Sequence, residues 1–105
     1  MGNGTSLSKD DLVHLKKVSK VFSEKWTLEI ISVLLDGNEA MGFNELIKKL
    51  DGISAAVLSH RLKSLQDWGY MTREVQPGPP TRTKYMLTNK GKNLMGIAEF
   101  VLQHK

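Results

Sequence analysis

The sequence predicts a small, mainly α-helical domain that carries one β-hairpin. Apolar residues at helical spacing run through most of the chain, and a proline-rich loop separates two short strand-like segments near the C-terminal end. The length of 105 residues fits one domain. A content of 40% hydrophobic and 25% charged residues is typical of a soluble globular protein.

Two helices are expected in the N-terminal third, after a tail of residues 1–7 that we expect to be disordered. The serine and two aspartates of residues 8–11 mark a helix start, and apolar residues recur at helical spacing as far as Phe22. The second helix is expected over residues 25–35, where a broad apolar face predicts a central, largely buried element. The Asp-Gly-Asn segment at 36–38 ends it.

The middle of the chain predicts a short helix, a tight turn and a longer helix. Residues 41–43 are expected to form a brief strand, and Asn44 to cap a helix over residues 45–50 that an Asp-Gly pair ends. Ser54 is expected to cap the next helix, and Gly69 to end it. This order of elements is the helix-turn-helix arrangement.

A β-hairpin and a last helix complete the predicted fold. Residues 70–76 and 84–87 are expected to pair around a loop with three prolines, which forbids helix there. Thr88 is expected to cap the last helix. The hairpin is basic, with Arg73 on the outgoing strand, Arg82 at the tip and Lys84 on the return strand.

The outer face of the helix that follows Ser54 points to DNA. At about 100° per residue, Ala55, Leu58, Leu62 and Leu65 fall on one side and should face the core. Ala56, Ser59, His60 and Lys63 fall on the opposite side. Small residues permit close approach to a major groove, while hydroxyl, imidazole and ammonium groups bind base edges or phosphates. Taken alone, the pattern fits a solvated amphipathic helix better, but the neighbouring short helix and basic hairpin favour DNA. Within the hairpin, Arg73, Arg82 and Lys84 are expected to contact DNA.

The charge distribution supports a partner with negative charge. Residues 1–53 carry seven basic and eight acidic residues, whereas residues 54–105 carry eight basic and three acidic ones. A solvated basic surface without a partner would show the same asymmetry.

The two terminal helices are expected to join two copies of the chain into a homodimer. The last helix could instead pack on the core of its own chain, but so small a chain has little core in which to bury two further apolar stripes. The residues expected at this contact are Leu12, Leu15, Leu94, Ile97, Ala98 and Val101. A two-fold dimer would present its two DNA-binding helices about 34 Å apart and would select an inverted-repeat operator.

Several function classes fit the sequence poorly. It contains no cysteine, and its three histidines lack the spacing of metal ligands, so we expect neither a metal site nor a cofactor nor an enzyme. We find no run of apolar residues long enough for a membrane span and expect a cytoplasmic protein. A protein-interaction module and a non-specific architectural DNA binder remain alternatives. A small-molecule effector site near Phe22 and Trp26 is a weaker hypothesis, because both residues are typical of a core.

Seven segments occur in an order that resembles a known family. They are Lys25-Trp26-Thr27, Phe43-Asn44-Glu45-Leu46, Gly52-Ile53-Ser54, Leu58 to Leu65, Gly69-Tyr70, Arg73-Glu74-Val75 and Tyr85 to Gly91, the last two separated by the proline-rich loop. Together they resemble the HxlR-type winged helix-turn-helix transcription regulators, relatives of the MarR group. The resemblance covers about residues 18–102.

The resemblance implies a DNA-binding homodimer with a recognition helix over residues 54–68 and a wing over residues 76–84. By position, it implies that Ser54, Ala55, Ala56, Ser59, His60 and Lys63 meet the major groove and that Arg82 meets the backbone or minor groove. Members often carry a cysteine before the Lys-Trp-Thr segment, and some use it to sense oxidants or electrophiles. This chain has none there, and the two positions after Ser54, often long and polar in the family, are both alanine.

Overall fold

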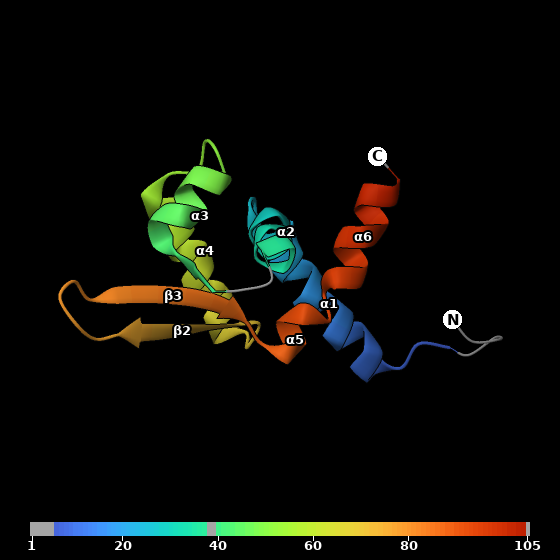
Figure 1. The fold of residues 1–105 in the computed structure, drawn as a ribbon. Coiled ribbons are helices and arrows are strands. Elements are labelled where there is room, and N and C mark those ends of the chain that lie inside the picture. The colour runs from blue at the N-terminus through green and yellow to red at the C-terminus, as the bar shows by residue number, and fades with distance from the viewer. Residues whose placement is uncertain (1–5, 38–39, 105) are drawn as a thin grey trace.

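Six helices and three short strands make up the part of the chain that the structure, a computed structural model, describes: residues 6–37 and 40–104 (Figure 1). The elements are α1 (Lys9–Ser23), α2 (Thr27–Gly37), β1 (Met41–Gly42), α3 (Phe43–Lys49), α4 (Ala55–Asp67), β2 (Met71–Gln76), β3 (Arg82–Leu87), α5 (Asn89–Lys92) and α6 (Met95–Gln103). The predicted mainly helical fold with a small hairpin is confirmed. Of the predicted tail, residues 1–5 lie outside the described residues, and Ser6 and Leu7 have no regular secondary structure.

Helix α1 begins where the sequence predicts, and α2 begins later. The Ser8 hydroxyl accepts a hydrogen bond from the Asp11 amide at 3.0 Å, and the Asp11 carboxylate accepts one from the Ser8 amide at 3.0 Å. The predicted start of α2 at Lys25 is wrong by two residues, because Trp26 has a φ of 79° and cannot continue a right-handed helix. Thr27, Ile30, Ile31 and Leu34 of α2 are buried, as expected for a central helix.

Helices α3 and α4 form the predicted helix-turn-helix. The predicted cap at Asn44 is wrong: α3 begins at Phe43, because the Glu45 carboxylate accepts a hydrogen bond from the Gly42 amide at 3.0 Å and fixes that end. The predicted cap of α4 is confirmed, since the Ser54 hydroxyl accepts from the Val57 amide at 3.1 Å. Gly69 ends α4 with a φ of 81°, a conformation that favours glycine.

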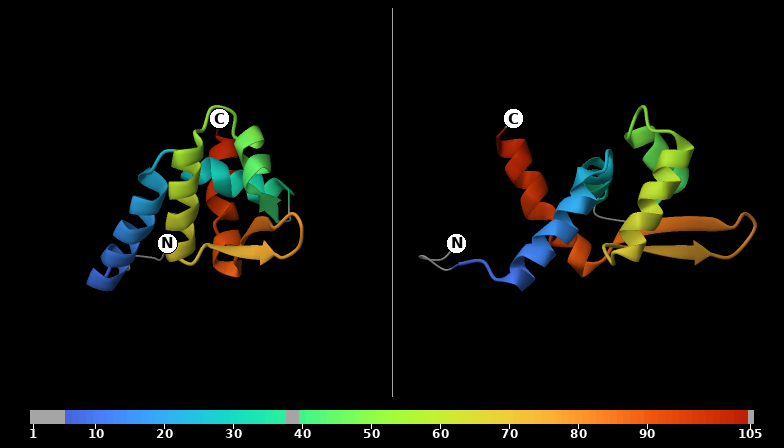
Figure 2. Two further views of the ribbon diagram at one scale, coloured as in Figure 1. Left: turned by 90° about the vertical axis from the view of Figure 1, so that its left-hand side faces the viewer. Right: turned by 180° about the vertical axis from the view of Figure 1, so that it is seen from behind.

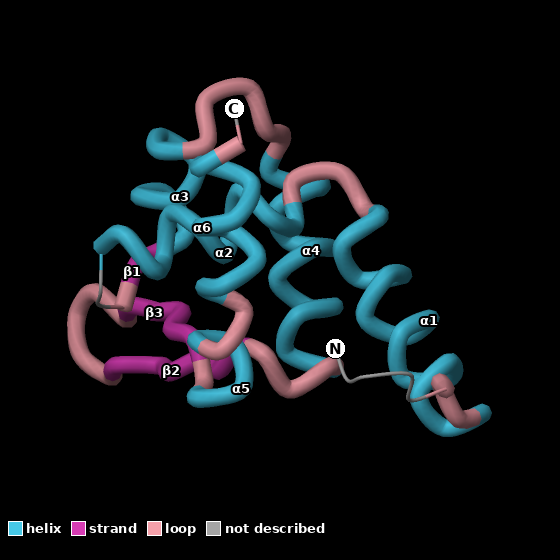
Figure 3. Tube along the Cα trace, turned by 90° about the vertical axis from the view of Figure 1, so that its right-hand side faces the viewer, coloured by secondary structure: helices cyan, strands magenta, loops and turns pink. Residues whose placement is uncertain are grey.

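The three strands form one antiparallel sheet in the order β1-β3-β2, as Figure 3 shows. Met41 pairs with Tyr85 on one side of β3, and Arg73 pairs with Tyr85 on the other. The hairpin of β2 and β3 projects beyond the helices with residues 77–81 at its tip, and we call residues 76–84 the wing (Figure 1). Arg82 was predicted at the tip, but it is the first residue of β3 and pairs with Gln76.

The predicted last helix is divided into two. Thr88 caps α5 as expected, its hydroxyl accepting from the Gly91 amide at 3.1 Å, but α5 ends at Lys92 and α6 starts at Met95. Between them the chain makes tighter three-residue turns, in which the Leu94 amide donates to the Gly91 carbonyl oxygen and the Ile97 amide donates to the Leu94 carbonyl oxygen, both at 3.0 Å. A β-carbon at Gly91 would clash with the Tyr70 carbonyl oxygen, so this glycine permits the close approach of α5 to the start of β2.

The core lies where α2, α3 and α4 meet the sheet. Ile30, Ile31, Leu46, Leu58, Leu62 and Leu65 are its most deeply buried side chains. Three of these six come from α4, and fully burying a leucine contributes roughly 1.5–3 kcal/mol. The core thus fixes the inner face of α4 and, with it, the direction of the outer face.

The wing and the terminal helices lie at opposite ends of the molecule. Figure 2, which shows the molecule from behind in its right panel, has the wing at one end and α1 and α6 at the other. None of the helices within residues 6–37 and 40–104 has the length and apolar character needed to cross a lipid bilayer.

Candidate nucleic-acid interface

The outer face of α4 is exposed and rich in small, polar and basic side chains. All six residues predicted to meet the major groove are exposed: Ser54, Ala55, Ala56, Ser59, His60 and Lys63. The expectation that Ala55 also faces the core is wrong. Ala55 is the first residue of α4 and lies one turn before Leu58, so its direction on the helical wheel does not bring it to the depth of the core.

Lys63 is free to move on this face. Its ammonium lies 3.7 Å from the Asp67 carboxylate, but the two side chains are 78% and 62% exposed. Such exposed ion pairs contribute little to stability and are screened by salt. The Lys63 ammonium can therefore exchange this carboxylate for a phosphate or a base edge without a large cost to the fold.

His60 is held by its neighbour Arg61. The Arg61 Nη1 atom lies 2.9 Å from His60 Nδ1, and Arg61 Nη1 also lies 3.0 Å from the Glu24 carboxylate. Arg61 Nε donates to the Lys25 carbonyl oxygen at 2.7 Å. These bonds tie α4 to the segment between α1 and α2.

The register of the hairpin separates the basic residues of the wing onto two faces. Arg82 and Lys84 alternate with Thr83 and Tyr85 along β3, so they share one face of the sheet. Arg73 pairs with Tyr85 and projects from the other face. Arg73 and Arg82 are exposed, whereas Lys84 is partly buried.

Lys84 binds a carboxylate of α3. Its ammonium lies 3.1 Å from the Glu45 carboxylate, which also accepts the Gly42 amide. The Gly42 amide first, and then Lys84, lower the pKa of Glu45 below its ordinary value. The side chain predicted as a DNA contact thus anchors the wing to α3, while Arg82 lines an adjoining cleft of about 430 Å³.

Two residues of this surface were missed by the sequence analysis. Both lie within segments that carry the family resemblance, and no contact was predicted for either. Their partners lie 36 and 39 positions away in the chain, at Lys25 and Lys84, so helical periodicity carries no signal for either bond.

The terminal helices expose apolar side chains. In α1, Leu12, Val13 and Leu15 are 48%, 52% and 49% exposed, and in α6, Ile97, Phe100, Val101 and Leu102 are 39%, 62%, 47% and 59% exposed. Leu94, predicted at the dimer contact, is only 8% exposed and packs in the core of its own chain. The side chain of Ala98 lies outside the described part of the chain.

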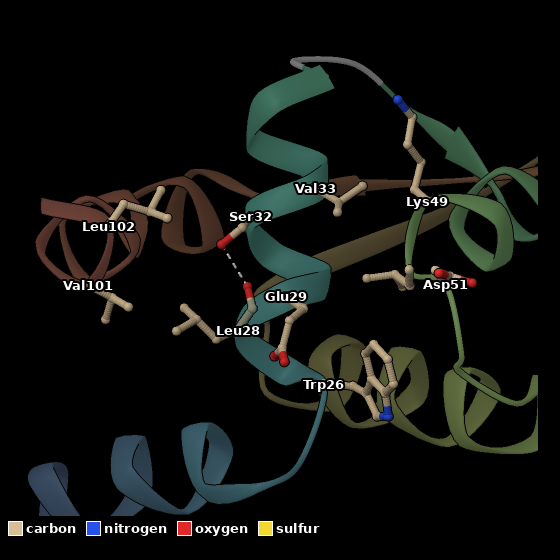
Figure 4. A pocket seen from close by; sticks show the side chains of 10 residues that line it. Trp26, Leu28, Glu29, Ser32, Val33, Lys49, Asp51, Val101 and Leu102 are labelled. Atoms are coloured by element: carbon tan, nitrogen blue, oxygen red, sulfur yellow. Dashed lines mark hydrogen bonds between the residues drawn. The ribbon is translucent and has the colours of Figure 1, made fainter. Parts of the chain in front are cut away.

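A cavity of about 590 Å³ lies on α2 between α6 and the turn that precedes α4 (Figure 4). Its walls are mostly apolar, and Figure 4 shows Trp26 and Val33 on one side of α2 and Leu28, Val101 and Leu102 on the other. Trp26 thus lines a cavity in the region where the sequence suggests a small-molecule site, and Phe22 is not among its lining residues. The occupancy of this cavity stays a prediction.

These elements match a known family along most of the chain. The HxlR-like helix-turn-helix family matches residues 21–104, which includes every element from the end of α1 to the end of α6. The chain belongs to the HxlR-like helix-turn-helix family. The predicted membership is confirmed.

Curated relatives of this HxlR-like protein are transcriptional regulators. YvaP of Bacillus subtilis, an uncharacterized HTH-type transcriptional regulator, is 39% identical over 82 residues, which span 78% of this chain and 74% of YvaP. YodB of Bacillus subtilis, an HTH-type transcriptional regulator, is 34% identical over 84 residues, 77% of this chain and 73% of YodB. The chain spans a smaller share of some other relatives, 56% in one case.

Solved structures of regulators have the same fold. A MarR-family transcriptional regulator from Porphyromonas gingivalis superposes with a TM-score of 0.82 at 27% identity, covering 94% of each chain. The predicted winged helix-turn-helix fold is confirmed by this similarity. The HxlR-like protein is thus a transcriptional regulator with a helix-turn-helix DNA-binding fold.

Proposed function

We propose that this HxlR-like regulator binds DNA sequence-specifically as a homodimer. Helix α4, with Ser54 to Trp68, lies in the major groove as the recognition helix, and residues 76–84 meet the backbone or minor groove as the wing. Within the wing, Arg82 is the contact that reaches DNA, and Lys84 holds the wing in place through Glu45. Arg73, on the other face of the hairpin, is a second and weaker candidate.

The observation that carries this proposal is the chemistry of the exposed face of α4. The residues from Ser54 to Lys63 that point outward are small, polar or basic, and the first turn contains no acidic residue. Alanines at the start of the helix allow close approach to base edges, and His60 and Lys63 supply polar groups. The centre of a protein-binding face is typically richer in apolar and aromatic side chains and poorer in charged ones.

The homodimer is supported by the apolar side chains that α1 and α6 expose. Exposed apolar side chains concentrated on two helices of a small domain are typical of a contact surface. In the proposed dimer the contact uses Leu12 and Leu15 of α1 and Ile97 and Val101 of α6. Leu94 takes part only by supporting α6 from the core.

The proposal is tested by a fluorescence-anisotropy titration of the purified protein against DNA enriched by binding from genomic fragments. Scrambled DNA of the same length and composition is the control, and both are measured at two salt concentrations. The expected result is binding to the enriched duplex that is at least about a thousandfold tighter than binding to scrambled DNA.

Equal and salt-sensitive binding to both duplexes would contradict sequence-specific recognition. It would favour the non-specific architectural binder, since phosphate contacts alone give affinity without sequence preference. No binding to either duplex would favour the protein-interaction module.

A further inference from the structure

Arg61 lies at the boundary between the core and the outer face of α4. Its side chain is 18% exposed, and its guanidinium is held by the Glu24 carboxylate at 3.0 Å and by the Lys25 carbonyl oxygen at 2.7 Å. The remaining short contact joins Nη1 to His60 Nδ1 at 2.9 Å. Arg61 is thus fixed from behind and reaches one specific atom of an exposed side chain.

The direction of that last hydrogen bond follows from the chemistry of the two groups. A guanidinium carries five N–H donors and no acceptor, so Arg61 can only donate. His60 Nδ1 must therefore accept, which requires its lone pair. A neutral imidazole carries one hydrogen, and with Nδ1 as acceptor this hydrogen is on Nε2.

We propose that Arg61 is a positioning residue, which fixes the ring of His60 as its Nε2–H tautomer and so presents a single hydrogen-bond donor to DNA. This inference rests on the proposed function. The Nε2 atom is at the far end of the imidazole from the helix backbone, and His60 is exposed on the outer face of α4. The partner that this donor requires is a hydrogen-bond acceptor on the nucleic acid.

The tautomer restricts what His60 can recognise. Guanine O6 and N7, adenine N7, thymine O4 and phosphate oxygens all accept from an N–H, whereas the cytosine N4 amine in the major groove only donates. His60 in this form therefore discriminates against a cytosine edge if it meets a base. In the opposite tautomer, Nε2 would accept a hydrogen bond, and His60 would then favour a donor such as the cytosine N4 amine.

The first experiment observes the tautomer in the free protein, in mildly alkaline buffer. Long-range ¹H–¹⁵N correlation spectra distinguish a protonated from an unprotonated ring nitrogen, and His60→Ala identifies the signals of His60. The expected spectrum has a protonated Nε2 and an unprotonated Nδ1. An Nδ1–H form or an even mixture in the unmodified protein would overturn the proposal.

Two variants separate positioning from a purely structural role of Arg61. Arg61→Met removes every donor and should give a mixture of tautomers, whereas Glu24→Gln removes the ion pair but leaves the bond to His60 and should preserve the wild-type pattern. Both variants lose the interaction between Arg61 and Glu24, so both are expected to lower the melting temperature. A wild-type pattern in Arg61→Met would show that Arg61 does not select the tautomer.

The second experiment tests the donor on DNA. A glutamine amide nitrogen lies near the position of Nε2, and an asparagine amide lies near that of Nδ1. The affinity of His60→Gln for the enriched duplex should be within about threefold of the wild-type affinity. His60→Asn and His60→Ala should each bind this duplex about tenfold more weakly, the effect of one net hydrogen bond. Equal losses for glutamine and asparagine would contradict an Nε2 donor.

Scrambled DNA identifies the acceptor. If His60→Ala loses affinity only for the enriched duplex, the hydrogen bond of His60 goes to a base edge. If His60→Ala loses affinity equally for both duplexes, the hydrogen bond goes to a phosphate oxygen. If wild type fails to distinguish the two duplexes, the proposed function fails, while the spectrum still decides whether Arg61 sets the tautomer.

Discussion

The two ends of the molecule expose different kinds of side chain. At one end, the outer face of α4 and the wing present alanine, serine, histidine, lysine and arginine. At the other end are eight of the nine large apolar side chains that are strongly exposed within the described residues, and Val75 on β2 is the ninth. Exposure is common to both ends, so the chemistry of the exposed groups is what distinguishes the proposed DNA surface from the proposed dimer surface.

The end of the molecule that carries α4 and the wing is also held together by bonds between distant segments. Arg61 joins α4 to the segment before α2, and Lys84 joins the wing to α3. The Thr88 hydroxyl donates to the Gly69 carbonyl oxygen at 2.7 Å, and the Lys90 ammonium donates to the Trp68 carbonyl oxygen at 3.0 Å. The segment from Thr88 to Lys90, which follows β3, is thus bonded to the end of α4, so the base of the hairpin and α4 are joined.

The largest effect is expected from a charge at the apolar end. Val101→Glu places two carboxylates in the proposed two-fold contact, which costs about 3 kcal/mol and raises the dimer dissociation constant about a hundredfold. Analytical ultracentrifugation measures the change. Val75→Glu is the matched control, because Val75 is 49% exposed and Val101 is 47% exposed, yet only Val101 lies in the terminal helices. An equal effect of both substitutions would remove the distinction between the two ends.

A smaller effect is expected on the outer face of α4. Lys63→Ala should weaken binding to the enriched duplex about tenfold and leave the melting temperature within about one degree, because the pair with Asp67 is exposed. Anisotropy and thermal unfolding measure the two quantities. Early melting of Lys63→Ala would mean that the side chain supports the fold.

A still smaller effect is expected at the wing. Arg82→Ala should weaken binding to enriched and scrambled DNA alike, by about two- to fivefold, and reduce the salt slope by about one charge. Lys84→Ala should mainly lower the melting temperature, since its ammonium binds Glu45. A salt slope unchanged in Arg82→Ala would exclude this residue from the contact.

The smallest effect concerns pH and the anchoring of the wing. Since the folded state lowers the pKa of Glu45, its ionised form stabilises the protein fully above the ordinary value of 4.5, and this contribution is lost as pH falls through the lower folded pKa. Glu45→Gln should therefore melt below wild type at neutral pH, with the difference shrinking in acid below pH 4.5. A difference that does not change with pH would mean that ionisation of Glu45 plays no part.

Local signals in the sequence predicted most of the elements. Ser8, Ser54 and Thr88 are caps that act on amides three residues ahead, and Gly69 ends α4 through its own φ. Such signals depend on a few neighbouring residues and need no tertiary structure. The errors at Trp26 and Asn44 arose where an unusual backbone angle or a competing carboxylate decided the helix start.

The parts of the candidate site that depend on distant contacts were not predictable in this way. Placing Arg73 and Arg82 on opposite faces requires the strand register, and the anchoring of Lys84 requires knowledge of its partner Glu45. The exposure of Ala55 depends on how far α4 extends beyond the core. A helical wheel gives the direction of a side chain, but it contains no information on strand register, on partners from distant segments or on how deeply a side chain is buried.

In the proposed dimer, the terminal helices at one end of the molecule set the spacing at which the two recognition helices meet DNA. Anisotropy titrations of the enriched operator, compared with those of an operator whose half-sites are separated by about five additional base pairs, half a helical turn, test this arrangement. We expect the longer spacing to reduce affinity to that of a single half-site, at least about tenfold weaker, while binding to scrambled DNA is unchanged. Equal affinity for both operators would contradict it, because the two chains would then bind DNA independently.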